Sequence, residues 1–131
     1  MSADSLILCI DDEALGLQIR KVVLEQAGYR VLTALNGASG LALFREHPVD
    51  AVILDYFMPG MTGGQVAAEM RRTRADIPIL LLSAYVDLPT GVIQTVDFTL
   101  MKGDRPELLM EKIQEMLGSR RTSRGAAGES A

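Results

Sequence analysis

The sequence predicts an α/β fold with a doubly wound, five-stranded parallel sheet, and three observations lead to this prediction. Short apolar runs of strand length recur five times along the 131 residues. Each run is followed by a segment of helix length, and most of these segments carry apolar residues at helical spacing. Four of the runs end beside Asp, Ser or Lys. Because strand–helix–strand units pair in parallel with right-handed crossovers, we expect helices on both faces of the sheet.

The first half of the chain contains two strand–helix units, with strands expected at residues 5–10 and 29–34. The first helix should stop at Gly28 and carries an apolar helical stripe composed of Leu15, Ile19, Val22 and Val23. Asn36 can cap the second helix, which should end before Pro48. Three residues of this helix are expected to face inward, namely Ala38, Leu41 and Ala42.

The third unit surrounds Asp55. Residues 51–54 are apolar and partly β-branched, which is typical of a strand buried on both faces, and the run ends at this acid. A Pro-Gly pair then forces a turn. Thr62 and Gln65 form a capping box that starts a helix over about residues 63–72. The residues that this helix turns inward are Val66, Ala67 and Met70.

The fourth and fifth strands are expected at residues 79–82 and 96–101. A short helix can begin between them at Pro89. Gly91 and Thr95 lower its helical propensity, so we expect it to be the least regular of the five helices.

The last helix is expected to begin at a capping box formed by Asp104 and Glu107 and to end at Gly118. Its apolar stripe consists of Leu109, Ile113, Met116 and Leu117. Residues 1–117 have the length of one domain. Residues 118–131 are small and polar without an apolar face, so we expect a disordered tail or linker there.

Composition narrows the function classes. The net charge is −4, which argues against direct binding of nucleic acid, and the absence of Trp beside only three Tyr and three Phe leaves no stacking platform for bases. No apolar run is long enough to span a membrane, and the expected location is cytoplasmic. Cys9 is the only cysteine, which excludes an internal disulfide and is typical of a small core residue.

The chemically active residues follow different strands, but a parallel sheet brings its strand ends to one edge. We therefore expect five side chains to meet there, those of Asp11, Asp12, Asp55, Ser83 and Lys102. Crowded carboxylates repel and favour a hard cation such as Mg²⁺. An amine and a hydroxyl beside them suit a tetrahedral dianion next to a carboxylate nucleophile, which is the chemistry of phosphoryl transfer. Ordinary polar residues at strand ends are the alternative.

Four sequence segments, CIDDE, ILDYFMPGMTGG, LLLSAY and TLMKG, closely resemble the receiver domain of two-component response regulators. The resemblance covers residues 5–117, and its D-x-x-M-P-G-x-x-G signature is specific. It implies a flavodoxin-like (βα)5 fold, similar to the chemotaxis regulator, with strand order 2-1-3-4-5.

The resemblance also implies a role for each residue at the edge. Asp55 would be the phosphoacceptor, receiving the group from a sensor histidine kinase or a histidine phosphotransfer protein. Lys102 would pair with the acceptor and then with the phosphoryl group. Ser83 would bond a phosphoryl oxygen and move toward it, carrying its loop along.

The implied cofactor is Mg²⁺. Asp12, Asp55 and the main-chain carbonyl of Phe57 would bind it directly, and Asp11 would hold a metal-bound water. Phe57 and Tyr85 occupy positions that modulate hydrolysis in this family. Two bulky rings there predict a phosphoaspartate that hydrolyses slowly.

Three departures from the family pattern concern signal output, which in the family uses the surface of the fourth helix, fifth strand and fifth helix. Gly103 replaces the usual proline after the lysine. Thr99 replaces an aromatic residue, and Phe98 should face the opposite side of the strand. The segment from Ser83 to Lys102 is also short. We therefore expect intact phosphorylation chemistry with an atypical output surface.

Two alternative functions stay open. A Mg²⁺-dependent phosphohydrolase with an Asp nucleophile usually has an acid where Phe57 stands and a cap insertion that this chain lacks. A receiver-like binding module without phosphorylation would not need the complete chemical set. The favoured interpretation is a signalling domain whose only reactions are its own phosphorylation and dephosphorylation. Its expected partners are the phosphodonor and an output domain or protein, and phosphorylation is a candidate trigger for dimerisation.

Overall fold

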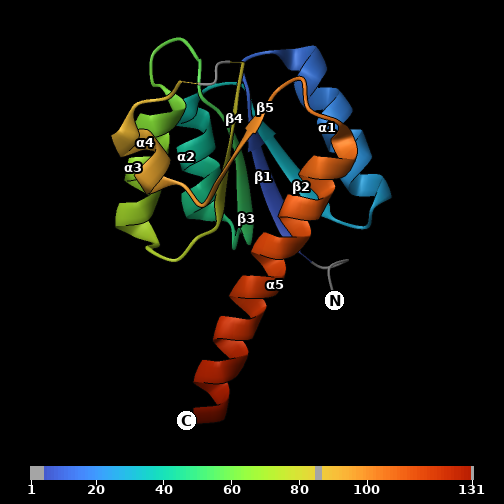
Figure 1. Ribbon diagram of the computed structural model, residues 1–131. Helices are drawn as coiled ribbons and strands as arrows, with labels where there is room; N and C mark the ends of the chain where they lie inside the picture. The colour runs from blue at the N-terminus through green and yellow to red at the C-terminus, as the bar shows by residue number, and fades with distance from the viewer. Residues whose placement is uncertain (1–4, 85–86, 131) are drawn as a thin grey trace.

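The computed structural model describes residues 5–84 and 87–130 and contains one five-stranded parallel sheet (Figure 1). The strand order β2-β1-β3-β4-β5 confirms the prediction. The strands are β1 (Leu6–Ile10), β2 (Arg30–Ala34), β3 (Ala51–Asp55), β4 (Ile79–Ser83) and β5 (Phe98–Met101).

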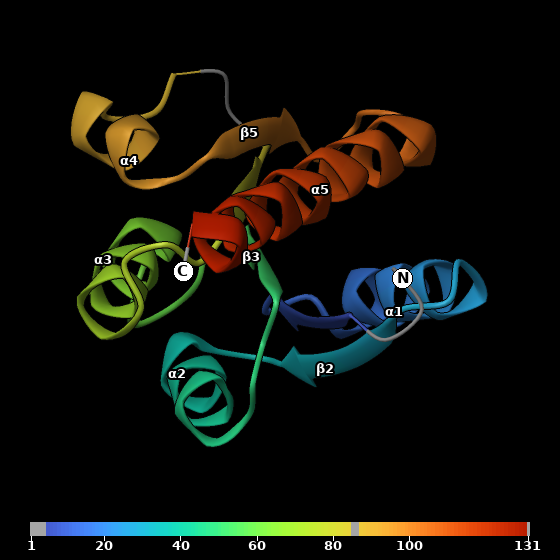
Figure 2. The same cartoon turned by 90° about the horizontal axis from the view of Figure 1, so that it is seen from below.

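The helices cover both faces of the sheet, as Figure 2 shows. One face carries α1 (Ala14–Gln26) and α5 (Pro106–Ser130). The other carries α2 (Gly37–Glu46), α3 (Gly63–Thr73) and α4 (Thr90–Thr95). Every residue of β1, β3 and β4 is buried, because alternate side chains enter the two apolar layers. Cys9 belongs to the layer under α1 and α5, which confirms its place in the core.

Two helix starts follow the expected capping chemistry. The Asn36 side chain accepts a hydrogen bond from the Ser39 amide at 2.8 Å. Thr62 Oγ1 accepts from the Gln65 amide at 3.2 Å, and Gln65 Oε1 accepts from the Thr62 amide at 2.9 Å. Each cap satisfies amide groups that the first helical turn leaves without an intrahelical partner.

Three of the four residues in the predicted apolar stripe of α1, Leu15, Ile19 and Val22, face solvent instead of the core, and Val23 is half-buried. The exposed fractions are 75% for Leu15 and 57% for Ile19, whereas Leu17 and Leu24 are buried against the sheet. Both sets have helical spacing, so the apolar pattern alone does not decide which face packs inward.

The buried face of α2 also differs in part from the expectation. Ala38 and Ala42 are exposed, while Leu41 is buried as expected and Phe44 joins it. Gly40 packs so closely on β1 that an added Cβ would lie 2.3 Å from Ile10 Cδ1. In α3 the three residues expected to face inward are buried.

The expected start and end of the last helix were both wrong. The Asp104 carboxylate accepts a bond from the Met101 amide at 2.9 Å, and α5 begins at Pro106, whose fixed φ suits the first helical position. The helix does not end at Gly118 but continues to Ser130. Glycine lowers helix stability by only about 1 kcal/mol, so it is no obligatory stop. The assignment of residues 118–131 to a linker outside the domain stays a prediction.

Two arginines donate hydrogen bonds to the loops at the amino edge of the sheet, the edge at which the strands begin. Arg71 donates to the carbonyls of Thr95, Ala75 and Ile77 and pairs with Asp97 at 2.7 Å. Arg74 donates to the carbonyls of Val49, Phe44 and His47. These loops precede β3, β4 and β5, so the network fixes the edge that lies away from the strand-end acids.

Candidate functional site

The carboxyl edge of the sheet brings the expected residues together. Asp55 is the last residue of β3, Ser83 is the last residue of β4, and Asp11 follows β1 directly. The register pairs Ile10 with Leu54, which sets Asp11 beside Asp55. Lys102 follows β5, and its amide donates to the Ser83 carbonyl at 2.9 Å.

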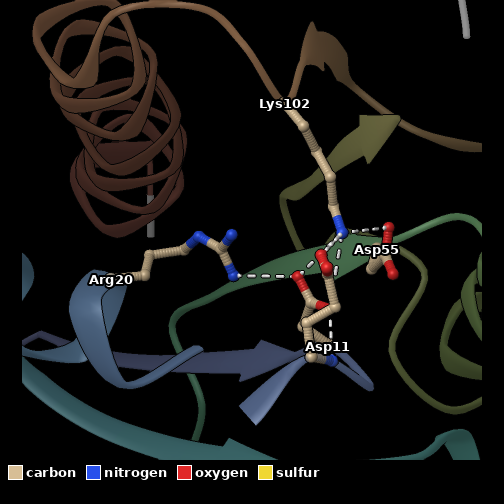
Figure 3. A network of polar contacts seen from close by, with 5 residues as sticks. Asp11, Arg20, Asp55 and Lys102 are labelled. Carbon is tan, nitrogen blue, oxygen red and sulfur yellow. Dashed lines mark hydrogen bonds and ion pairs between the residues drawn. The ribbon is translucent and has the colours of Figure 1, made fainter. Parts of the chain in front are cut away.

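The Lys102 amine lies among three acids (Figure 3). Its Nζ is 3.2 Å from Asp55 Oδ1, 3.2 Å from Asp11 Oδ2 and 2.9 Å from Glu13 Oε1. Burial disfavours its charge, but the bonds to Glu13 and Asp55 and the charge of Asp11 more than compensate and raise the pKa of Lys102. The amine is therefore a fixed positive charge at the site.

The Asp55 carboxylate is almost completely buried. Burial, together with the negative charge of Asp11, raises the pKa of Asp55 to about 6, although Lys102 opposes the shift. Among the described residues, Asp55 Oδ2 has no hydrogen-bond partner. A buried oxygen of this kind is suited to a cation or to a reacting group.

Carboxylate oxygens of Asp11, Asp12 and Asp55 lie within 4.8 Å of one another. Asp12 is exposed, whereas the other two are buried. Oxygen donors at this spacing suit a hard divalent ion such as Mg²⁺, and the free Oδ2 of Asp55 provides one ligand position. The chemistry of the donor set therefore fits the expected metal.

Arg20 and Glu13 also contact the site, and neither was predicted from the sequence to belong to it. Arg20 Nη1 lies 3.3 Å from Asp11 Oδ2, and Figure 3 shows the guanidinium reaching this acid from α1. No local motif marks Arg20, because the contact depends on how α1 packs. Glu13 directly follows the acid pair, and its position in sequence could have identified it.

The loop after Asp55 explains the glycines of the signature. Gly60 has φ +85°, a left-handed conformation that side chains rarely adopt. Gly63 donates its amide to the Tyr56 carbonyl at 2.8 Å, and a Cβ there would lie 2.5 Å from the Asp55 carbonyl oxygen. Both glycines therefore let the chain turn back against the end of β3.

Three residues are expected from the sequence to modulate the site, namely Phe57, Tyr85 and Thr99. Phe57 is largely exposed, and its ring packs edge-on against Tyr56 at 5.1 Å between centroids. Tyr85 lies outside the described residues. Thr99 is exposed on β5, whereas Phe98 packs toward α5 with Lys112 Nζ 5.1 Å from its ring centroid. Phe98 and Thr99 thus face opposite sides of the strand, as predicted.

The turn after Lys102 is closed without proline. The Asp104 amide donates to the Met101 carbonyl at 3.0 Å, and its carboxylate accepts from the Met101 amide. Asp104 therefore holds the turn that contains Gly103.

Among the residues that the structure describes, no helix has both the length and the apolar character that crossing a membrane requires.

Comparisons with known proteins agree on one family. The family model described as "Response regulator receiver domain" matches residues 7–114. The chain is 37% identical over 114 residues to a probable transcriptional regulator, ycf27, from Cyanidium caldarium. This alignment covers 85% of the chain and 45% of the relative, so the chain spans about half the length of the curated relatives it matches.

Two solved structures are also similar to this chain in fold and in sequence. The response regulator protein TrrA from Thermotoga maritima, in complex with Mg²⁺ and BeF, has a TM-score of 0.80 and 36% identity, with 86% of this chain and 99% of that chain covered. TrrA in complex with the histidine kinase ThkA matches at TM-score 0.80 and 34% identity, covering 86% and 98%.

Proposed function

The chain belongs to the response regulator receiver family, and on that premise we propose that Asp55 accepts a phosphoryl group from a phosphohistidine of a sensor kinase or histidine phosphotransfer protein. The observation that carries this proposal is the buried Asp55 carboxylate, 3.2 Å from Lys102 on one oxygen and free of described partners on the other. A relative's complex with a histidine kinase supports the choice of donor.

In the proposed reaction a carboxylate oxygen of Asp55 attacks phosphorus. The phosphorus–nitrogen bond to the donor histidine breaks, the new phosphorus–oxygen bond forms, and the released imidazole takes a proton from solvent. Lys102 already touches Asp55 and stabilises the negative charge on the transferred oxygens. The hydroxyl of Ser83, at the end of the neighbouring strand, donates to one of them.

Asp12, Asp55 and the Phe57 carbonyl would hold Mg²⁺, and Asp11 would act through a water. Asp11 already accepts bonds from the Glu13 amide and Arg20, which supports an indirect role for it. Bound there, Mg²⁺ would supply the positive charge that lets a carboxylate approach a phosphoryl dianion.

The exposed α1 stripe, defined here as Leu15, Ile19 and Val22, is the proposed docking surface for the phosphodonor. Ile19 lines a cavity of about 230 Å³ that is also lined by Met101 and Lys102, so the middle of the stripe borders the site. Ile19→Ser removes apolar surface without adding charge beside Lys102, so it should reduce transfer from a phosphohistidine donor several-fold and leave phosphorylation by acetyl phosphate intact. Ile93→Ser, which changes an exposed isoleucine on α4, is the matched control.

For signal output we propose the surface of α4, β5 and α5, used in an atypical way. Thr99 has no ring to swing inward, and Phe98 is held on the α5 side of β5. The output module is a separate protein or another part of the same polypeptide, in the cytoplasm, and dimerisation on phosphorylation is one route to it. Structures with and without a phosphoryl mimic that show an inward aromatic swing at β5 would contradict this output scheme.

We also propose that Phe57 and Tyr85 slow the attack of water on phosphoaspartate. Phe57→Gly should shorten its half-life several-fold. Loss of the phosphoryl group within seconds in the purified, Mg²⁺-containing wild-type protein would overturn the idea.

One experiment tests the function itself. Purified protein is incubated with acetyl phosphate and Mg²⁺ and weighed by mass spectrometry. A gain of one phosphoryl group is expected, absent from Asp55→Asn and retained in Asp76→Asn, a change of an exposed acid before β4. Multiple turnover of an added phosphate ester would instead indicate the phosphohydrolase, and no gain with any phosphodonor would indicate a binding module.

A further inference from the structure

Arg20 has no place in the proposed reaction, yet its guanidinium enters the acid cluster. Its side chain is only 14% exposed, and Nη1 lies 3.3 Å from Asp11 Oδ2. The same oxygen lies 3.2 Å from Lys102 Nζ, and the other Asp11 oxygen accepts the Glu13 amide at 2.9 Å. Asp11 is therefore held by two cations and one backbone donor.

This arrangement places two fixed positive charges beside the three carboxylates that can hold a metal. Lys102 takes part in the proposed reaction, whereas Arg20 pairs with no acid other than Asp11 among the described residues. We propose that Arg20 is a positioning residue that partly neutralises Asp11 and thereby weakens the affinity of the site for Mg²⁺. The inference rests on the proposed function, because it concerns the same metal site.

Loss of Arg20 would have two opposing effects. The Asp11 side chain would lose one of its donors and some of its orientation, which disfavours metal binding. It would keep Glu13 and Lys102, however, so most of the orientation remains. The loss of a cation next to a divalent ion favours binding, by about threefold to tenfold at the dielectric and screening of a partly exposed site. The charge effect is the larger one.

The same coupling must appear in stability, because linkage is reciprocal. In EDTA, Arg20→Gln leaves the acids less neutralised and should destabilise the protein. In saturating Mg²⁺ this difference in the free energy of unfolding should shrink by RT times the logarithm of the affinity ratio, which is about 1.4 kcal/mol for a tenfold rise in affinity.

The test measures Mg²⁺ affinity by calorimetric titration and by amide chemical shifts of residues 11–13 and 56, without any phosphodonor. Arg20→Gln should bind Mg²⁺ about threefold to tenfold more tightly than the wild type. Arg20→Lys keeps the charge and should stay close to the wild type. Lys21→Gln removes the same charge one residue along α1, where Lys21 pairs with Glu25, and is the matched control.

The outcomes of this test distinguish the role of Arg20 from the proposed metal site itself. Equal or weaker binding by Arg20→Gln, in a protein whose wild type binds Mg²⁺ through Asp12, overturns the role of Arg20 alone. If Lys21→Gln raised the Mg²⁺ affinity by the same factor, the effect would come from the net charge of the protein, which would also overturn the role of Arg20. A wild type that binds no Mg²⁺ would overturn the metal site of the proposed function and this inference with it.

Discussion

Lys102 and Asp55 are joined at one oxygen only: Nζ lies 3.2 Å from Oδ1, whereas Oδ2 is buried with no partner among the described residues. The protein thus provides a cation to one oxygen of the carboxylate and no described partner to the other. A buried charge in this state lowers the stability of the metal-free protein and favours the binding of a cation.

The first prediction concerns pH. The pKa of Asp55 is raised to about 6 in the folded protein, against about 3.9 in an unfolded chain. The folded state therefore binds this proton more tightly, and the free energy of unfolding should fall as pH rises from about 4 to about 6. Asp55→Asn removes the charge and should stabilise the metal-free protein by about 1–2 kcal/mol at pH 7.5, allowing for solvent screening, and by much less at pH 4. Urea denaturation of the wild type and of Asp55→Asn in EDTA measures this difference in the free energy of unfolding. A difference of the same size at pH 4 and pH 7.5 would contradict the prediction.

Metal binding should be visible in thermal unfolding. Mg²⁺ at about one hundred times its dissociation constant adds about 2.7 kcal/mol to the free energy of unfolding. We expect Asp12→Asn to remove this gain, because Asp12 is exposed and the substitution leaves the fold intact. Asp76→Asn should retain the gain, and EDTA should reverse it. A gain that survives in Asp12→Asn would place the ion elsewhere.

Gly63→Ala should destabilise the protein by about 1–3 kcal/mol. The new Cβ would lie 2.5 Å from the Asp55 carbonyl oxygen and 2.8 Å from Tyr56 Cα, and backbone atoms cannot yield as a side chain can. Gly16→Ala is the control, since no atom lies within 4 Å of its Cβ position in α1, and it should stabilise by about 0.5–1 kcal/mol. Chemical denaturation of the two variants compares them directly, and a neutral Gly63→Ala would refute the close approach.

Arg74→Met should lower the free energy of unfolding by about 2–3 kcal/mol. The guanidinium donates to the carbonyls of Phe44, Val49 and His47 and lies 4.0 Å over the Phe44 ring. Arg72→Met, at an exposed position in the last turn of α3, should change stability by less than about 0.5 kcal/mol. Similar losses in both variants would show that the network does not stabilise the loop.

Much of the fold was predictable because strand length, full burial and strand-end polarity all lead to the same parallel sheet. The meeting of Asp55 with Lys102 follows from that topology alone. The orientation of α1 did not follow, because Leu15 and Ile19, four residues apart, fit one face of a helix as well as Leu17 and Leu24, seven residues apart. Spacing identifies an apolar face but does not tell whether a core or a partner covers it.

Arg20 was missed for a related reason. Its contact with Asp11 depends on the rotation of α1 about its own axis, and no motif encodes that rotation. In the last helix, by contrast, local sequence signals predicted ends that the structure does not have. Gly118 was expected to end the helix but lies inside α5, and Asp104 was expected to cap it but closes the preceding turn.

The arginine network at the amino edge has a consequence for how such a domain can evolve. Arg71 and Arg74 anchor loops on the side of the sheet away from Asp55. In the function proposed above, donor choice depends on Ile19 and signal duration on Phe57, which lie beside the carboxyl edge of the sheet. Substitutions at these two residues would leave the arginine anchors in place. The edge that carries the site can therefore change in sequence while the opposite edge of the sheet keeps the contacts that hold its loops.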